Sequence, residues 1–280
     1  MKKILVPTDF SPQAEHAARF ALFLAGKMNA SVVLHHSYVL PVYATDLPLA
    51  LPSDMDLDKA SHEGLDNLVA RLKKDFPASI ISTSVSDGFA EESVPRASKE
   101  ADADFIVMGT RGATGLREAL IGTVTGSVME KATVPVIAVP DESEWTNFDR
   151  ILYATSYEEG DFENVEEVFG FAKQLGAEVV LLHISTGKFD KTYEFDAIER
   201  FSDRMKEETG FDRISFKLLE DDDVFEGIVE YPEEIKADMI AMTLRERPFL
   251  RKLFERSTTK RVAYHTKVPL MSFHGSTSGL

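Results

Sequence analysis

Three glycines in the N-terminal half of the sequence are spaced as in a loop that binds an anion. Two residues separate Gly109 from Gly112, and nine separate Gly112 from Gly122. Glycine lets the backbone turn back on itself and bring its N–H groups close to a negative charge. Thr123 opens a predicted helix directly after Gly122, and the start of a helix adds unpaired N–H groups and a positive dipole end. The pattern therefore predicts a phosphate-binding loop.

The other side chains of this loop also suit a phosphate. Threonine hydroxyls could donate to its oxygens and arginine could offset its charge. The candidates are Thr110, Thr114, Thr123, Thr125, Arg111 and Arg117. The loop is not a Walker P-loop, because no Gly-Lys-Ser/Thr follows, and a dinucleotide fingerprint would come after the first strand. A purely structural alternative stays open, in which the glycines only make a tight connection between a strand and a helix.

Residues 7–9, Pro-Thr-Asp, form a second polar segment after the first apolar run of the chain. Asp9 could accept hydrogen bonds from a ribose or a base, or hold a metal ion through water. His35 and His36 are neighbours on a predicted strand. Their side chains therefore point to opposite faces and cannot bind one metal ion together.

Apolar patterns place these segments on an alternating series of strands and helices. Short apolar runs predict strands at 3–6, 31–36, 80–85, 105–108 and 134–139. Helical periodicity predicts helices from Ser11-Pro12 onward and at 57–76, 89–101 and 123–132. Strict alternation is typical of a doubly wound α/β domain, in which helices cover both faces of a parallel sheet. Ligands of such sheets bind outside the carboxyl ends of the strands, where the strand order reverses.

The sequence contains this pattern twice. Residues 3–9 recur at 150–156, and residues 103–108 recur at 237–242. We therefore expect two domains, and their predicted bounds are 1–143 and 148–280.

Two kinds of segment between the predicted elements are notable. The Pro-rich segment 38–58 is largely missing from the second copy. It is too apolar for a free loop and is either a lid over the ligand or a surface packed on the other domain. The acidic runs 158–161 and 220–223 are most simply solvated turns.

These residues resemble the universal stress protein family in its tandem two-domain form. The resemblance is carried by the glycine pattern ending in Gly122-Thr123, by residues 3–11 and by residues 134–139. It implies a five-stranded parallel sheet in each domain, in the order 3-2-1-4-5, which puts Asp9 and Gly109 on neighbouring strands. It also implies an ATP-binding sensor or regulator of the stress response, often with Mg²⁺ or Mn²⁺ beside the nucleotide.

Carried over by position, the resemblance implies two groups of contact residues. Those bordering the base and ribose are Pro7, Thr8, Asp9 and Ser37, and Ser37 replaces the family's usual apolar residue. Those holding the ribose and phosphates are Gly109, Thr110, Arg111, Gly112, Ala113, Thr114, Gly115, Gly122, Thr123, Val124 and Thr125. No catalytic residue follows from the resemblance.

The second copy keeps the strands and loses the glycines. Thr243 stands where the first copy has Gly109, and Glu246 stands for Gly112. We expect no ATP there, because side chains replace the glycines and Glu246 would repel phosphate. The loop is instead basic, with Arg245, Arg247, Arg251, Lys252, Arg256, Lys260 and Arg261. This run is either a solvated face or a surface for a different anionic ligand or a partner.

The bulk composition excludes several classes of protein. A net charge of −16 repels the phosphates of nucleic acids and anionic lipids. The chain has no cysteine, which excludes disulfides, zinc–thiolate sites and iron–sulfur clusters. It also has no run of about 20 apolar residues, the length that a membrane-spanning helix needs. We therefore expect a cytoplasmic protein that binds neither nucleic acid nor membranes.

The predicted strand edges indicate how the copies assemble. The fifth strands, at 134–139 and 268–273, would be exposed edges, which invite pairing. The family resemblance suggests the same pairing. We expect an internal pseudo-dimer of the two domains, and a homodimer is a further option.

Three functions stay open at this point. The first is a regulatory protein that binds ATP and turns it over slowly or not at all, since no general base is evident beside the phosphates. The second is a slow ATP-hydrolysing enzyme in which Asp9 organises metal and water. The third is a scaffold or interaction protein whose glycine loop is vestigial.

Overall fold

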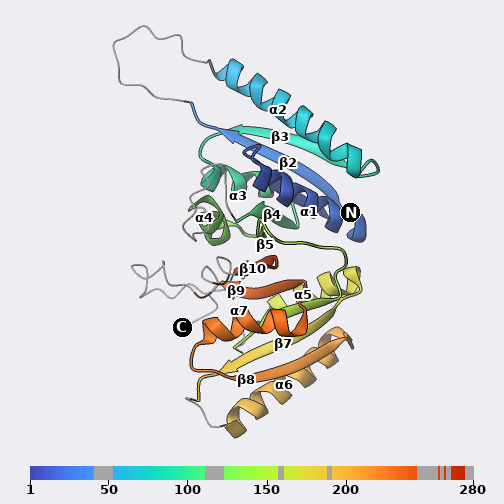
Figure 1. The fold of residues 1–280 in the computed structure, drawn as a ribbon, viewed down its shortest axis with the longest axis vertical. Coiled ribbons are helices and arrows are strands. Elements are labelled where there is room, and N and C mark those ends of the chain that lie inside the picture. Colours follow the sequence, from blue (N-terminus) through green and yellow to red (C-terminus); the bar gives the residue numbers. More distant parts are fainter. Residues whose placement is uncertain are drawn as a thin grey trace, which may run out of the picture. The chain divides into compact units, whose positions relative to one another are not determined.

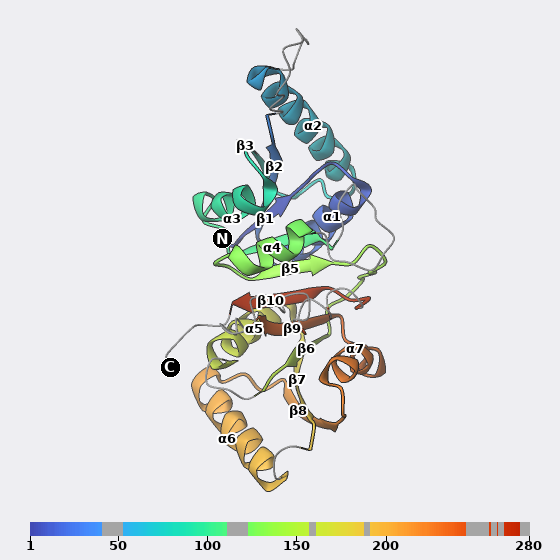
Figure 2. The ribbon, with the colours of Figure 1, turned by 90° about the vertical axis from the view of Figure 1, so that its left-hand side faces the viewer.

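The computed structural model describes residues 1–40, 53–110, 123–156, 161–187, 191–244, 258, 262 and 266–274. Contacts within the chain divide it into two compact units, Met1–Asp141 and Glu142–Leu280. Each unit is a parallel sheet with helices packed on it (Figures 1 and 2). Within the described residues, no helix is long and apolar enough to cross a membrane.

The first unit follows the predicted alternation. Its elements are β1 (Lys3–Pro7), α1 (Pro12–Met28), β2 (Ser31–Tyr38), α2 (Asp54–Asp75), β3 (Ile81–Asp87), α3 (Ala90–Glu100), β4 (Phe105–Gly109), α4 (Thr123–Lys131) and β5 (Val136–Val139). The strands are parallel and lie in the order β3-β2-β1-β4-β5. α1 and α2 share ion pairs on one face, and α3 packs against α4 on the other.

The second unit repeats this arrangement. Its elements are β6 (Arg150–Ala154), α5 (Asp161–Leu175), β7 (Glu178–Ser185), α6 (Lys191–Thr209), β8 (Ile214–Glu220), α7 (Val224–Ile235), β9 (Met239–Leu244) and β10 (Leu270–His274). Its strand order, β8-β7-β6-β9-β10, is the same 3-2-1-4-5 order. The predicted doubly wound α/β fold is therefore confirmed.

The first strand of each unit is fastened in the same way. The backbone N–H of Lys3 donates to Asp104 Oδ2 at 2.7 Å, and that of Arg150 donates to Asp238 Oδ2 at 2.9 Å. The side chains of Lys3 and Arg150 both reach a carbonyl oxygen at the end of the helix that precedes that aspartate. Such matching contacts are what a sequence duplication should leave in the structure.

Local capping residues set where the first helices begin. Ser11 accepts from the Ala14 N–H ahead of α1, as its predicted N-cap position requires. α2 begins at Asp54 rather than at the predicted residue 57. The reason is a capping box, in which Ser53 Oγ accepts from the Asp56 N–H and Asp56 Oδ2 accepts from the Ser53 N–H. Residues 54–58 therefore belong to α2 and not to the Pro-rich segment, whose predicted bounds were 38–58.

Candidate functional site

The predicted ligand edge lies where β1 and β4 end side by side. The two strands are paired in parallel with Ile4 opposite Phe105 and Leu5 opposite Ile106. Asp9 follows β1 by two residues, and Gly109 is the last residue of β4. In the sheet, β2 lies on the other side of β1 and β5 lies on the other side of β4, so the strand order reverses between β1 and β4. This is the switch point at which doubly wound sheets bind ligands.

A tight turn fixes Asp9 beyond the end of β1. The N–H of Thr8 donates to the His35 carbonyl at 2.8 Å, and Thr8 Oγ1 accepts from the Phe10 N–H at 3.0 Å. Asp9 Oδ1 accepts from the Ser11 N–H at 3.0 Å and from Ser11 Oγ at 2.5 Å. Thr8 is buried and serves to build the turn, whereas Asp9 is exposed. The turn thus presents a carboxylate whose orientation is set.

Two of the predicted threonines tie the end of β4 to its neighbours. Thr125 Oγ1 donates to the Gly109 carbonyl at 2.9 Å, and the Thr110 N–H donates to the Val139 carbonyl at 3.1 Å. Both threonines are buried. The Thr125 hydroxyl is therefore engaged within the protein and would have to leave Gly109 to donate to a phosphate. Thr123, the first residue of α4, is exposed.

Several predicted residues lie outside the described part of the chain. In the first unit these are Arg111, Gly112, Ala113, Thr114, Gly115, Arg117 and Gly122. The basic residues predicted for the loop of the second unit all lie outside it as well, as does most of the segment 38–58. Val124 and Ser37 are described and half-buried, and Ser37 pairs in register with Ser86 of β3.

The two adjacent histidines of β2 point to opposite faces, as predicted. His36 Nδ1 donates to the Thr8 carbonyl at 2.8 Å. His183 occupies the equivalent position of the second copy and makes the same bond to the Thr155 carbonyl at 3.0 Å, so the two histidines share a structural role. His35 is buried on the other face, against α3. In the described ranges, no three His, Asp or Glu side chains gather as metal ligands would.

Sequence reasoning missed the part that Phe10 plays in the turn that holds Asp9. The Phe10 backbone has a left-handed φ of 64°, and its ring packs on His36 with 4.4 Å between ring centroids. Phenylalanine gives no sequence signal for a left-handed residue, since asparagine, aspartate and glycine are the usual ones there. The repeat gave a signal only for His36, because His183 stands at the equivalent position of the second copy.

The second unit fills the corresponding strand end with side chains. Thr243 occupies the position of Gly109 near the end of β9. Its Oγ1 lies 2.8 Å from the Tyr153 hydroxyl, accepts from Asn164 Nδ2 at 2.9 Å and donates to Asp161 Oδ1 at 3.1 Å. In the first unit, valine and two alanines stand where these three partners are. The polar network is therefore specific to the second copy.

Asp161 corrects one expectation about the acidic segments. It is 1% exposed, and its Oδ2 accepts from Thr155 Oγ1 at 2.8 Å and from the Ser156 N–H at 3.1 Å. It is therefore a buried member of the network and not part of a solvated turn. Asp223, in the other acidic run, caps α7 by accepting from the Phe225 N–H at 2.8 Å. Aspartate favours this helix-cap position because its carboxylate satisfies an unpaired N–H.

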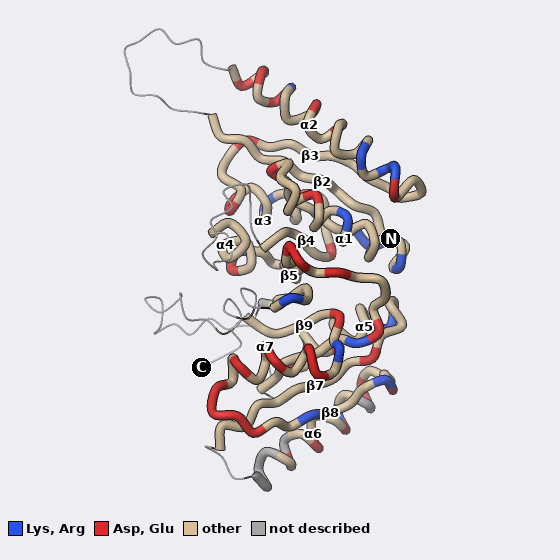
Figure 3. Tube along the Cα trace, viewed as in Figure 1, with Lys and Arg blue, Asp and Glu red and all other residues tan. Residues whose placement is uncertain are grey.

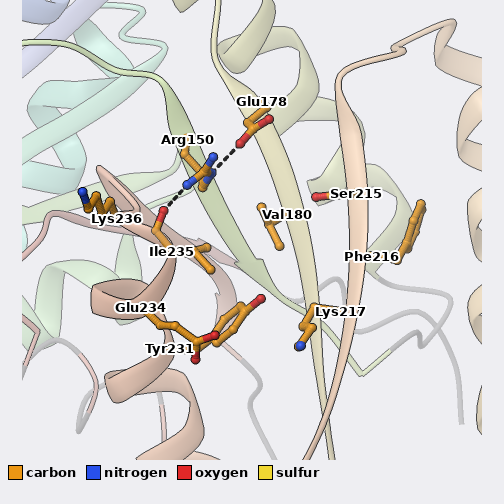
Figure 4. A pocket seen from close by; sticks show the side chains of 10 residues that line it. All are labelled: Arg150, Glu178, Val180, Ser215, Phe216, Lys217, Tyr231, Glu234, Ile235 and Lys236. Carbon is orange, nitrogen blue, oxygen red and sulfur yellow. Dashed lines mark hydrogen bonds and ion pairs between the residues drawn. The ribbon is translucent and has the colours of Figure 1, made fainter.

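A separate groove of about 460 Å³ lies in the second unit, beside the first residues of β6 and β7 (Figure 4). Arg150 and Glu178 form an ion pair on its wall, and Lys217 Nζ lies 5.7 Å from the centroid of the Tyr231 ring. Burial and the nearby Glu234 raise the pKa of Tyr231. The groove is at the amino ends of these strands and so does not correspond to the predicted nucleotide edge.

Comparisons with known proteins agree on one family. The model of the universal stress protein family matches residues 1–140 and again residues 147–274. Two universal stress proteins of Methanocaldococcus jannaschii are 31% and 29% identical to the chain over 141 and 152 residues. These matches cover 49% of the chain and 81% and 94% of those proteins.

A solved structure shares the fold of the whole chain. The crystal structure of a universal stress protein from Archaeoglobus fulgidus DSM 4304 matches with a TM-score of 0.76 and 21% identity, over 98% of both chains. The family match to both halves agrees with this shared fold and with the internal repeat. The chain therefore belongs to the universal stress protein family, with two domains of that family in tandem.

Proposed function

We propose that the first unit binds ATP at the ends of β1 and β4 and that the nucleotide makes the chain a regulator of a stress response. One observation supports this proposal most strongly. The first unit has Gly109 at the strand end where the second has Thr243 and its polar network. The same fold thus carries a glycine at this edge in one copy and closes it with side chains in the other.

The described residues offer complementary contacts for a nucleotide. Asp9 supplies an exposed acceptor for a ribose or base, and Thr123 stands at the start of α4, where helix N–H groups and the dipole favour phosphate. A Mg²⁺ or Mn²⁺ ion bound to the phosphates keeps several waters and needs few protein ligands. Asp9 is of the right chemistry to hold such an ion through water.

Binding fits this geometry better than rapid hydrolysis does. Asp9 Oδ1 already accepts two hydrogen bonds from Ser11, so this oxygen is engaged within the protein and is not aimed at a proton of an attacking water. We therefore expect slow or absent turnover. Phosphate release in a single turnover, lost in Asp9→Ala, would instead support an ATP-hydrolysing enzyme.

Isothermal titration of the full chain with MgATP tests the proposal. We expect one ATP per chain, and we expect Gly109→Thr to abolish binding because it places a side chain where the phosphates approach. Gly109→Ala should have a smaller effect. Thr243→Gly is the matched change in the second unit and should leave one site, because Asp161 remains buried there. No heat and no thermal shift with the wild type would overturn the proposal, and two sites would refute the assignment to the first unit alone.

A further inference from the structure

Phe10 has a backbone conformation that its own side chain does not favour. Its φ is 64°, and it lies directly between Asp9 and Ser11. A bulky residue at positive φ is an outlier that persists only where its surroundings hold it. The Phe10 N–H donates to Thr8 Oγ1 on one side of this residue, and Ser11 donates to Asp9 on the other. The orientation of the Asp9 carboxylate therefore depends on the conformation of Phe10.

The Phe10 ring is held between β2 and α2. On one side it packs on the His36 ring, with 4.4 Å between centroids and 32° between planes. His36 is itself fixed by its bond to the Thr8 carbonyl at 2.8 Å. On the other side is Gly64 of α2, where an added Cβ would lie 2.7 Å from Phe10 Cζ and 3.0 Å from each Cε. The Phe10 ring thus occupies the space that a side chain at position 64 of α2 would fill.

α2 is itself anchored, so it cannot easily move away from the ring. Leu65, Leu68 and Leu72 of the same helix are fully buried and face the sheet, where α2 contacts β2 and β3. Further along, Arg71 pairs with Glu15 of α1 at 2.9 Å. A side chain at position 64 would therefore displace the Phe10 ring rather than the helix.

We propose that Phe10 is a positioning residue for the nucleotide and that α2 controls it through the contact at Gly64. This inference rests on the proposed function, because the affected ligand contact is that of Asp9. Displacing the ring would release the left-handed turn and with it the bonds that orient the Asp9 carboxylate. By linkage, a nucleotide that needs the ordered turn would in return stabilise α2.

Titration of the full chain with MgATP, using paired variants, tests this coupling. We expect Gly64→Ala to bind ATP at least tenfold more weakly. Gly26→Ala is the matched control, because Gly26 is also a helical glycine and an added Cβ meets nothing within 4 Å; its affinity should not change. Phe10→Leu should bind several-fold more weakly, and adding Gly64→Ala to it should cause no further loss, because the ring that clashes is gone.

Thermal unfolding gives a readout that does not need the ligand. Alanine has the higher helix propensity, so Gly26→Ala should raise the melting temperature while Gly64→Ala lowers it. If Gly64→Ala does not fold, Phe10→Leu alone decides the question, and unchanged ATP affinity in that variant would overturn the inference.

The two proposals fail in different ways. A wild-type chain that binds no ATP would overturn the proposed function together with this inference. A wild-type chain that binds ATP, with a folded Gly64→Ala variant of equal affinity, would overturn only the coupling through Phe10.

Discussion

His35 is a buried histidine surrounded by serine hydroxyls. The residue is 1% exposed, with Ser84 Oγ at 3.3 Å from Nδ1 and Ser93 Oγ at 3.4 Å from Nε2. Burial, followed by the nearby charges of His36 and Arg96, lowers its pKa from 6.5 to about 4. The unfolded chain therefore takes up a proton between pH 6.5 and pH 4 that the folded chain does not.

The sign of the effect on stability follows directly. The contribution of neutral His35 to the free energy of unfolding is present in full above about pH 6.5 and is lost as the pH falls toward about 4. Over that window it amounts to about 3 kcal/mol at most, at 1.36 kcal/mol per pKa unit.

We predict that His35→Leu removes this part of the pH dependence. Leucine is a natural choice because Leu182 stands at the equivalent position of β7 and is buried. Urea unfolding at pH 7 and pH 4 should show a smaller loss of unfolding free energy in the variant than in the wild type, by up to about 3 kcal/mol. His62→Gln, on the exposed face of α2, is the control. Equal losses in wild type and His35→Leu would contradict the prediction.

At the residue scale, the sequence predicted positions better than conformations. The glycine spacing is visible in the residue types, whereas the strand order that puts Asp9 and Gly109 at one edge was implied by the family resemblance. The left-handed φ of Phe10 could not be predicted, since nothing in a phenylalanine indicates it. Asp161 was missed because an aspartate in an acidic run is usually solvated. Its burial depends on threonine and backbone donors, among them Thr243 from a distant strand.

At the scale of single elements, α2 shows how charge and capping define a helix. Asp54 and Asp56 lie in its first turn and Lys73 and Lys74 in its last (Figure 3), which matches the helix dipole. Apolar periodicity starts only at Leu57, so the periodic pattern predicted a later start. The Ser-x-x-Asp spacing of Ser53 and Asp56 was the signal that could have placed the true beginning.

We predict that Ser53→Ala lowers the unfolding free energy by about 1 kcal/mol, because the Asp56 N–H loses its side-chain acceptor, Ser53 Oγ. Ser53→Asn keeps a side-chain acceptor at the cap and should cost much less. Chemical denaturation of the two variants beside the wild type provides the measurement. A loss in Ser53→Asn as large as that in Ser53→Ala would argue against the capping role.

At the scale of the whole molecule, the duplication made the fold predictable. The strands and helices recur in the same sequence order in both units, and the structure repeats even the Lys3 and Arg150 contacts. What the repeat could not reveal is how the second copy compensates for its lost glycines. This compensation depends on which side chains of β6, α5 and β9 come into contact. The spacing of residues in the sequence does not predict such contacts.

The asymmetry between the units predicts where ATP acts. A ligand at one hundred times its Kd stabilises the state it binds by about 2.7 kcal/mol. We expect hydrogen exchange with saturating MgATP to slow in Met1–Asp141 and to stay unchanged in Glu142–Leu280. The Gly109→Thr variant should lose this protection. Equal protection of both units in the wild type would contradict the assignment.

Under our proposal, the network around Thr243 has a consequence for how the chain responds when nucleotide levels vary. Inside the second unit, the Thr243 hydroxyl contacts both the Tyr153 hydroxyl and the Asp161 carboxylate, so the protein's own side chains complete this strand end. The first unit, by our proposal, is completed only when ATP arrives. ATP would then change the first unit and leave the second as it is, so that only contacts made by Met1–Asp141 would respond to the nucleotide level.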